Sequence, residues 1–184
     1  MNTFAKLLFG TLVAVVVIGT QSWTRFSASQ PEAEINWISI EEAAELGSET
    51  PKLVFIDVYT DWCGWCKRMD RSTFRDPKVV EMMNKHYYAV KFNAEQKESI
   101  TLGDKTFKFV PNGRRGYHEL AAALLNGKMS YPTVVFLDEN FNMIQPIPGY
   151  RQASEILPIL AYFGENKHKE GVSFKAFEAD FQKR

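Results

Sequence analysis

The chain has 184 residues, of which 45% are hydrophobic and 24% charged, and this is the balance of a single ordinary globular domain. Lys plus Arg and Asp plus Glu each number 22, so the formal net charge is zero, which excludes a protein that holds nucleic acid or an anionic membrane by bulk positive charge. Only two cysteines are present, so no framework of disulfides staples the fold.

The first 29 residues are predicted to be an export segment. A short basic start precedes an uninterrupted apolar run at residues 7–18, LLFGTLVAVVVI. This run is shorter than the roughly 18–20 residues that cross a bilayer and is typical of the apolar centre of a secretory signal. With Ser27 and Ser29 as small residues for cleavage, we expect residues 1–29 to be a signal peptide and residues 30–184 to be the mature domain. The alternative is an uncleaved N-terminal membrane anchor. In both cases the domain is exported, to a periplasmic or extracellular compartment that permits disulfides.

Strand and helix signals alternate through the first half of the domain. The run KLVFIDVY at residues 52–59 is too continuously apolar for a half-exposed strand, so it is predicted to be central and buried on both faces. Ser39 and Asp76 are good helix N-caps, and Pro77 suits a first helical position. The elements predicted here are a strand at 35–38, a helix from Ser39 to Gly47, the central strand, a helix at 62–71, a helix that begins at Asp76-Pro77, and a strand at 87–93.

The second half adds hairpin patterns and a closing helix. Residues 99–110 alternate around Gly103-Asp104, which predicts a β-hairpin. Phe174, Phe177 and Phe181 recur at i, i+3 and i+7, so they share one face of a last helix, which we interpret as a core contact rather than a docking face. The other predicted elements are a helix at 117–125, an antiparallel pair of strands at 133–137 and 142–147, and a helix after Gly149. The pattern as a whole is α/β.

Both cysteines lie in the motif Cys63-Gly64-Trp65-Cys66, directly after the central strand and at the start of a helix. A cysteine at a helix N-terminus faces unpaired backbone N–H groups and the positive end of the helix dipole, which stabilise a thiolate over a thiol. A second cysteine three residues later lies one helical turn away, close enough to form a disulfide with the first. The pair can therefore accept or donate two electrons without moving the fold.

Other roles for this pair fit poorly. A zinc site needs two more ligands, and the histidines lie in unrelated segments, at His86, His118 and His168. Haem attachment needs a histidine after the second cysteine, where this chain has Lys67. A permanent structural disulfide across two residues would constrain the chain little. We therefore expect no metal, and no cofactor other than the redox-active disulfide Cys63–Cys66.

These residues resemble the thioredoxin superfamily. The stretch 55–67, FIDVYTDWCGWCK, looks like the family's strand, active-site turn and helix. Tyr131-Pro132-Thr133 is similar to its cis-proline loop, and Gly149 falls where the family has a glycine after the last strand. Trp62 and the stretch 72–77, STFRDP, look most like the exported branch, which includes the periplasmic thioredoxin-like domain of membrane electron-transporting disulfide reductases.

The resemblance covers roughly residues 35–163 and implies an α/β thioredoxin fold. We expect a central mixed sheet flanked by helices, with a β-hairpin insertion at about residues 99–116 and an extra C-terminal helix. The sequence departs from the family at that insertion, which the minimal fold lacks. It departs again at Gly64-Trp65, where ordinary thioredoxins carry Gly-Pro and oxidising members usually place a histidine.

Placement and resemblance together suggest roles for four residues. Cys63 is expected to be the attacking nucleophile because it is nearer the helix terminus, and Cys66 is expected to resolve the mixed disulfide. Burial on the strand would raise the pKa of Asp57, and the resemblance implies that this carboxyl relays a proton to or from Cys66. The alternative is a hydrogen-bonded structural carboxylate. Lys91 matches the family lysine opposite that acid, or else is a solvated strand lysine.

A second set of residues is expected to bind substrate. The resemblance implies that Pro132 is cis and presents the backbone of Tyr131 for strand-like pairing with a peptide. Trp62 and Trp65 are expected to form an apolar landing surface, with simple packing as the alternative. We interpret Arg114-Arg115 as a solvated loop rather than an anion site. The full set expected to bind substrate is Trp62, Gly64, Trp65, Tyr131, Pro132 and Thr133.

The sequence thus predicts an exported thiol–disulfide oxidoreductase that reduces protein disulfides. The dipeptide between the cysteines lacks the donor side chain with which strong oxidants stabilise a thiolate, and Asp57 and Asp61 oppose one. Expected partners are client proteins with disulfides and a membrane-borne electron donor, with no nucleic acid, and we expect a monomer. The alternatives are an oxidase or isomerase on the same fold, and a binding or chaperone module whose cysteines are incidental.

Overall fold

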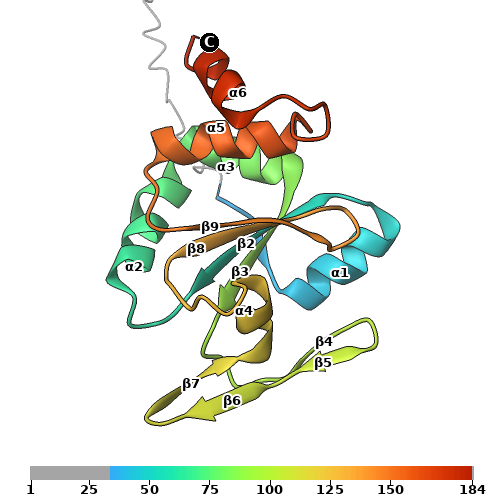
Figure 1. Cartoon of the computed structure of the whole chain (residues 1–184), viewed down its shortest axis with the longest axis vertical. Helices are drawn as coiled ribbons and strands as arrows, with labels where there is room; N and C mark the ends of the chain where they lie inside the picture. The colour runs from blue at the N-terminus through green and yellow to red at the C-terminus, as the bar shows by residue number, and fades with distance from the viewer. Residues whose placement is uncertain (1–33, 184) are drawn as a thin grey trace, which may run out of the picture. The chain divides into compact units, whose positions relative to one another are not determined.

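A five-stranded mixed sheet lies at the centre of the fold (Figure 1). The computed structural model describes residues 34–183, so the expected signal segment at 1–29 lies outside the described residues. The strand order is β1-β3-β2-β8-β9, with β3 parallel to β1 and β2, and β8 antiparallel to β2 and β9. The strands are β1 (Trp37–Ile38), β2 (Leu53–Tyr59), β3 (Tyr87–Asn93), β8 (Thr133–Leu137) and β9 (Met143–Pro148).

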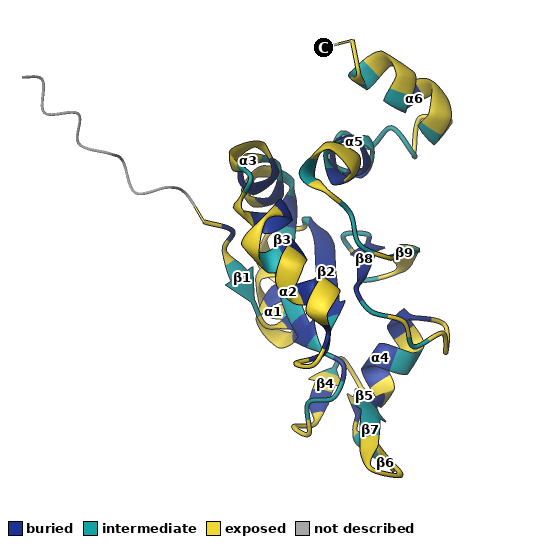
Figure 2. Cartoon of the chain, turned by 90° about the vertical axis from the view of Figure 1, so that its left-hand side faces the viewer, coloured by how far each residue is buried: buried dark blue, intermediate teal, exposed yellow. Residues whose placement is uncertain are grey.

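Helices cover both faces of this sheet (Figure 1). Side chains along β2 alternate between the faces, so Phe55 packs with α2, α3 and α5 whereas Ile56 packs with α1 and α4. Both side chains are fully buried, and the central strands are accordingly dark blue in Figure 2. The helices are α1 (Ile40–Glu49), α2 (Gly64–Arg71), α3 (Pro77–His86), α4 (Glu119–Leu124) and α5 (Ala153–Gly164), with a 3₁₀ turn η1 (Thr73–Arg75) after α2. The expected α/β thioredoxin fold is confirmed.

Local capping sets most helix boundaries. Ser39 accepts a hydrogen bond from the backbone N–H of Glu42, and Asp76 caps α3 with Pro77 as its first residue. Helix α1, however, continues past the expected stop at Gly47. The reason is packing: a Cβ on Gly47 would lie 3.1 Å from the ring of Phe141, so this glycine permits a close approach instead of ending the helix.

The insertion contains two hairpins where the sequence indicated one. The predicted hairpin is present as β4 (Ile100–Leu102) and β5 (Lys105–Phe107), and a second follows as β6 (Phe109–Asn112) and β7 (Arg115–His118). The helix predicted at 117–125 therefore begins only at Glu119, which corrects that prediction. The pairing of β6 with β7 requires a glycine at position 116, because a Cβ there would lie 2.2 Å from the ring of Phe109 on the opposite strand.

The last helix, α6 (Phe174–Phe181), packs on α5 through the predicted phenylalanine face. Phe177 is buried, and its ring centroid lies 5.5 Å from that of Tyr162 on α5. The ring of Phe174 lies 5.4 Å from the same tyrosine. The interpretation as core contacts is confirmed for Phe174 and Phe177, and the ring of Phe181 lies 5.8 Å from that of Phe177. Within residues 34–183, no helix is long and apolar enough to cross a membrane.

Candidate active site

The two cysteines form a disulfide at the start of α2, with their Cα atoms 5.3 Å apart. Cys63 is the N-cap of the helix, and its sulfur accepts a hydrogen bond from the backbone N–H of Cys66 at 3.1 Å. Cys63 is 4% exposed and Cys66 is 1% exposed. The helix therefore directs a backbone donor at the sulfur of Cys63, as a nucleophilic thiolate requires.

Two exposed indoles flank the disulfide. Trp62 is 51% exposed and Trp65 is 56% exposed, so neither is simply packed into the core. The ring of Trp62 meets Tyr131 edge-on at 6.0 Å, and its Nε1 donates to Glu95 at 3.0 Å. The ring of Trp65 lies 5.1 Å from that of Tyr150. Each indole is thus held in place at its edge while a large part of its surface stays open to a partner chain.

The loop before β8 reaches the same place. The Tyr131–Pro132 peptide bond is cis, as expected. Thr133 pairs with Val58 across β2 and β8, so this loop ends beside the end of the strand that leads to the cysteines. Burial, together with the nearby charge of Glu95, raises the pKa of Tyr131 to about 12, so its phenol stays protonated at neutral pH. The space above Gly64 is open, because a Cβ there would meet no other atom within 4 Å.

A buried acid lies beneath the site. Asp57 lies on β2, on the face that α2 covers, and is only 1% exposed. Its register partner is Lys91 on β3, whose Nζ lies 2.6 Å from Oδ2 of Asp57. Burial raises the pKa of Asp57 even though Lys91 opposes this. The other oxygen, Oδ1, is buried and has no hydrogen-bond partner among the described residues. Burial therefore favours the protonated form of Asp57, and its Oδ1 has no partner among the described residues that would compete for a proton.

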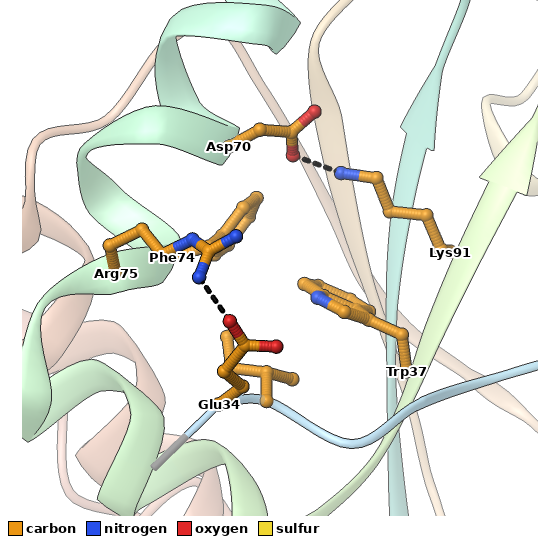
Figure 3. A pocket seen from close by; sticks show the side chains of 7 residues that line it. Glu34, Trp37, Asp70, Phe74, Arg75 and Lys91 are labelled. Carbon is orange, nitrogen blue, oxygen red and sulfur yellow. Dashed lines mark hydrogen bonds and ion pairs between the residues drawn. The ribbon is translucent and has the colours of Figure 1, made fainter. Parts of the chain in front are cut away.

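Lys91 is not the solvated lysine of the alternative interpretation. It pairs with Asp70 on α2 as well as with Asp57, and burial alone would lower its pKa, but the two carboxylates outweigh burial and raise it. Asp70 was missed by the sequence analysis, although it lies four residues after Cys66 and hence on the same side of α2. Figure 3 shows Asp70 and Lys91 at a pocket of about 270 Å³ that Trp37 also lines.

The insertion supplies a second residue that was missed. Arg114 is exposed, as a solvated loop predicts, but the guanidinium of Arg115 lies 4.5 Å from the centre of the Trp62 ring. Arg115 is exposed as expected, but it begins β7 rather than lying in a loop, and its side chain is placed against an aromatic ring. No sequence signal indicated this contact, because it depends on the second hairpin.

Among residues 34–183, no group of three His, Cys, Asp or Glu side chains is placed to hold a metal ion.

Comparisons with known proteins show the family to which the chain is similar. The family model Thioredox_DsbH, described as "Protein of unknown function, DUF255", matches residues 20–147. The thiol:disulfide interchange protein DsbD of Salmonella typhi is 34% identical over 82 residues, which are 42% of this chain. The match spans only 14% of the length of that relative.

Two solved structures share the fold. A thioredoxin from Thermus thermophilus superposes with a TM-score of 0.56 at 19% identity, over 76% of this chain and 94% of that one. A DsbH oxidoreductase superposes with a TM-score of 0.54 at 16% identity, over 77% of this chain and 93% of that one. At these identities the likeness shows the thioredoxin fold alone.

Proposed function

We propose that this chain, which belongs to the Thioredox_DsbH family, is a thiol–disulfide oxidoreductase that reduces disulfides in exported proteins. The observation that carries the proposal is the Cys63–Cys66 disulfide at the first turn of α2, with the backbone N–H of Cys66 directed at the sulfur of Cys63. Such a pair exchanges two electrons between a dithiol and a disulfide form.

The exchange takes two steps. In the reduced protein, the thiolate of Cys63 attacks one sulfur of a client disulfide, and the other client sulfur leaves as a thiolate that takes up a proton. Cys66 then gives its proton to the carboxylate of Asp57 and attacks Cys63 in the mixed disulfide. The second client thiol is released, and the protein is left with the Cys63–Cys66 disulfide. The client gains two electrons, and the protein loses two.

The surroundings of Cys63 support the reducing direction. Strong oxidants of this kind are strong because their reduced thiolate is highly stabilised. Among the described residues, the sulfur of Cys63 accepts a hydrogen bond only from one backbone N–H. Trp65, the larger residue between the cysteines, packs against Tyr150 and Arg68. With one backbone donor and no side-chain donor, the thiolate is only modestly stabilised, so the dithiol readily gives up electrons.

An insulin reduction assay tests this proposal. We expect the protein, with dithiothreitol as electron source, to accelerate the precipitation of insulin chains many-fold over dithiothreitol alone. The variant with both Cys63→Ser and Cys66→Ser is the control and should return the rate to background. A wild-type rate equal to that of the control would instead favour a binding or chaperone module. Refolding of a client with scrambled disulfides, run in parallel, measures the rival isomerase activity.

We propose further that residues 1–29 direct export and that a membrane-borne reductase resupplies electrons. An oxidising compartment converts the dithiol to the disulfide continually, so a reductant working there needs a donor. We expect the exported protein to begin within about residues 20–30, because signal peptides are cleaved after a short polar stretch of small residues. Mass analysis of the N-terminus checks this, and an intact Met1 on exported protein would support the membrane anchor instead.

A further inference from the structure

Each indole beside the disulfide is held by one tyrosine and one arginine. The Trp62 cluster consists of Trp62, Tyr131 and Arg115, and the Trp65 cluster of Trp65, Tyr150 and Arg68. In the first, the guanidinium of Arg115 lies 4.5 Å from the centre of the indole ring. In the second, that of Arg68 lies 5.5 Å from the indole and 5.7 Å from the tyrosine ring. A guanidinium group therefore lies against each of the two exposed indoles next to the cysteines in the sequence.

The second insertion hairpin holds Arg115 in its position. The base of the hairpin is tied to the loop after β3, where the N–H of His118 donates to the carbonyl of Ala94 at 2.7 Å. Glu95, the next residue, accepts the hydrogen bond from the indole of Trp62. Because residue 116 is a glycine, the ring of Phe109 can pack closely against the strand that carries Arg115. The second hairpin and the indole of Trp62 are thus both hydrogen-bonded to the loop at Ala94 and Glu95. This shared attachment brings Arg115 into contact with Trp62.

Among the described residues, the two arginines have no anionic partner, whereas of the three acids near them Asp70 is neutralised by a cation and Glu95 and Asp61 accept hydrogen bonds from neutral groups. Oε1 of Glu95 accepts from Trp62, Asp61 accepts from Asn93 at 3.2 Å, and Asp70 pairs with Lys91. Within residues 34–183, the guanidinium groups of Arg68 and Arg115 form neither an ion pair nor a hydrogen bond, and both residues are exposed. A guanidinium stacked on an aromatic ring keeps its N–H edge free for a carboxylate.

We propose that these two clusters select protein segments that carry Asp or Glu next to the reacting cysteine. The indoles supply the apolar contact, and the two guanidinium groups pair with carboxylates on either side of the client sulfur. The inference rests on the proposed reduction of client disulfides and adds to it the class of client segment. Arg115 is a specificity-determining residue that the insertion contributes.

The test uses two disulfide-linked peptide dimers that differ only in Glu or Gln on each side of the cysteine. The reduced wild-type protein should react faster with the Glu peptide, by about threefold for each exposed charge pair and about tenfold in all at low salt. The preference should shrink in high salt. The double variant Arg68→Gln with Arg115→Gln should lose the preference. The variant Arg71→Gln should keep it, because it removes the same charge from an exposed position of α2 outside both clusters.

Rates with dithiothreitol correct for the different intrinsic reactivities of the two peptides. Equal corrected rates for both peptides with the wild-type protein, or an unchanged preference in the double variant, would overturn the inference while leaving the proposed function standing. Reaction with neither peptide would count against the proposed function instead.

A binding measurement decides the inference independently of redox activity. It uses the same peptides with serine in place of cysteine and follows the indole N–H signals of Trp62 and Trp65 by NMR. Shifts that saturate at several-fold lower concentration of the Glu peptide support the inference, and identical titrations for the two peptides overturn it.

Discussion

Cys66→Ser is expected to accumulate covalent complexes with client proteins, whereas Cys63→Ser is expected to form none. Without Cys66, the mixed disulfide between Cys63 and a client has no resolving thiol inside the protein and persists. Both variants should lower the rate of insulin reduction to background. Non-reducing gels of the variants, after incubation with disulfide-containing clients, measure the trapped complexes, and mass analysis identifies the cysteine that carries the client.

The prediction is tested by the difference in trapped complexes between Cys66→Ser and Cys63→Ser. Both replacements are isosteric and both remove the disulfide, so they affect the stability of the fold alike. Complexes of equal abundance in the two variants would show that nucleophile and resolving cysteine are wrongly assigned. The double variant is the background control and should trap nothing.

Asp57→Asn is expected to stabilise the fold at neutral pH and to slow exchange. Because burial raises the pKa of Asp57, the folded chain binds this proton more tightly than the unfolded chain does. Its contribution to stability is therefore fully present below the ordinary Asp pKa of about 4 and is lost as the pH rises through the raised value. Asparagine cannot ionise, so at pH 7 the variant should gain about 1–3 kcal/mol in the free energy of unfolding. Lys91 keeps its pairing with Asp70 in the variant.

The same variant should slow the second step of exchange by about 10²-fold, because the introduced amide cannot accept the proton of Cys66. Denaturant unfolding at pH 4 and pH 7, together with stopped-flow decay of a mixed disulfide, measures both effects. Asp61→Asn is the matched control, since Asp61 is an exposed acid nearby that bonds to Asn93. An unchanged rate with lowered stability would make Asp57 a structural partner rather than a proton relay.

Features with local causes were predictable from the sequence. The cap at Ser39, the cap and proline at Asp76-Pro77, and the continuous apolar run of β2 each depend on residues close together in the chain, and all appear in the structure. The cysteine motif likewise predicted a candidate site at the start of α2. The prediction was possible because the backbone N–H groups of a helix N-terminus act on the sulfur of the adjacent cysteine.

Features that depend on tertiary packing were not predictable. Gly47 carries the signal of a helix stop, yet it lies inside α1 because Phe141 packs against it. The residues at 109–118 pair as a hairpin, and only that pairing brings Arg115 to Trp62. Asp70 was predictable only in part. Its spacing of four residues from Cys66 could be read from the sequence, but its partner Lys91 lies on β3, far along the chain.

The reduction potential of the Cys63–Cys66 pair tests the central claim most directly. It is obtained by equilibrating the protein with glutathione buffers and counting free thiols by mass. A reductant should have a potential near that of thioredoxin, about −270 mV, so that oxidised glutathione converts the dithiol fully to the disulfide. A potential near that of a strong oxidant, about −120 mV, with a dithiol that glutathione cannot oxidise, would contradict the reducing direction.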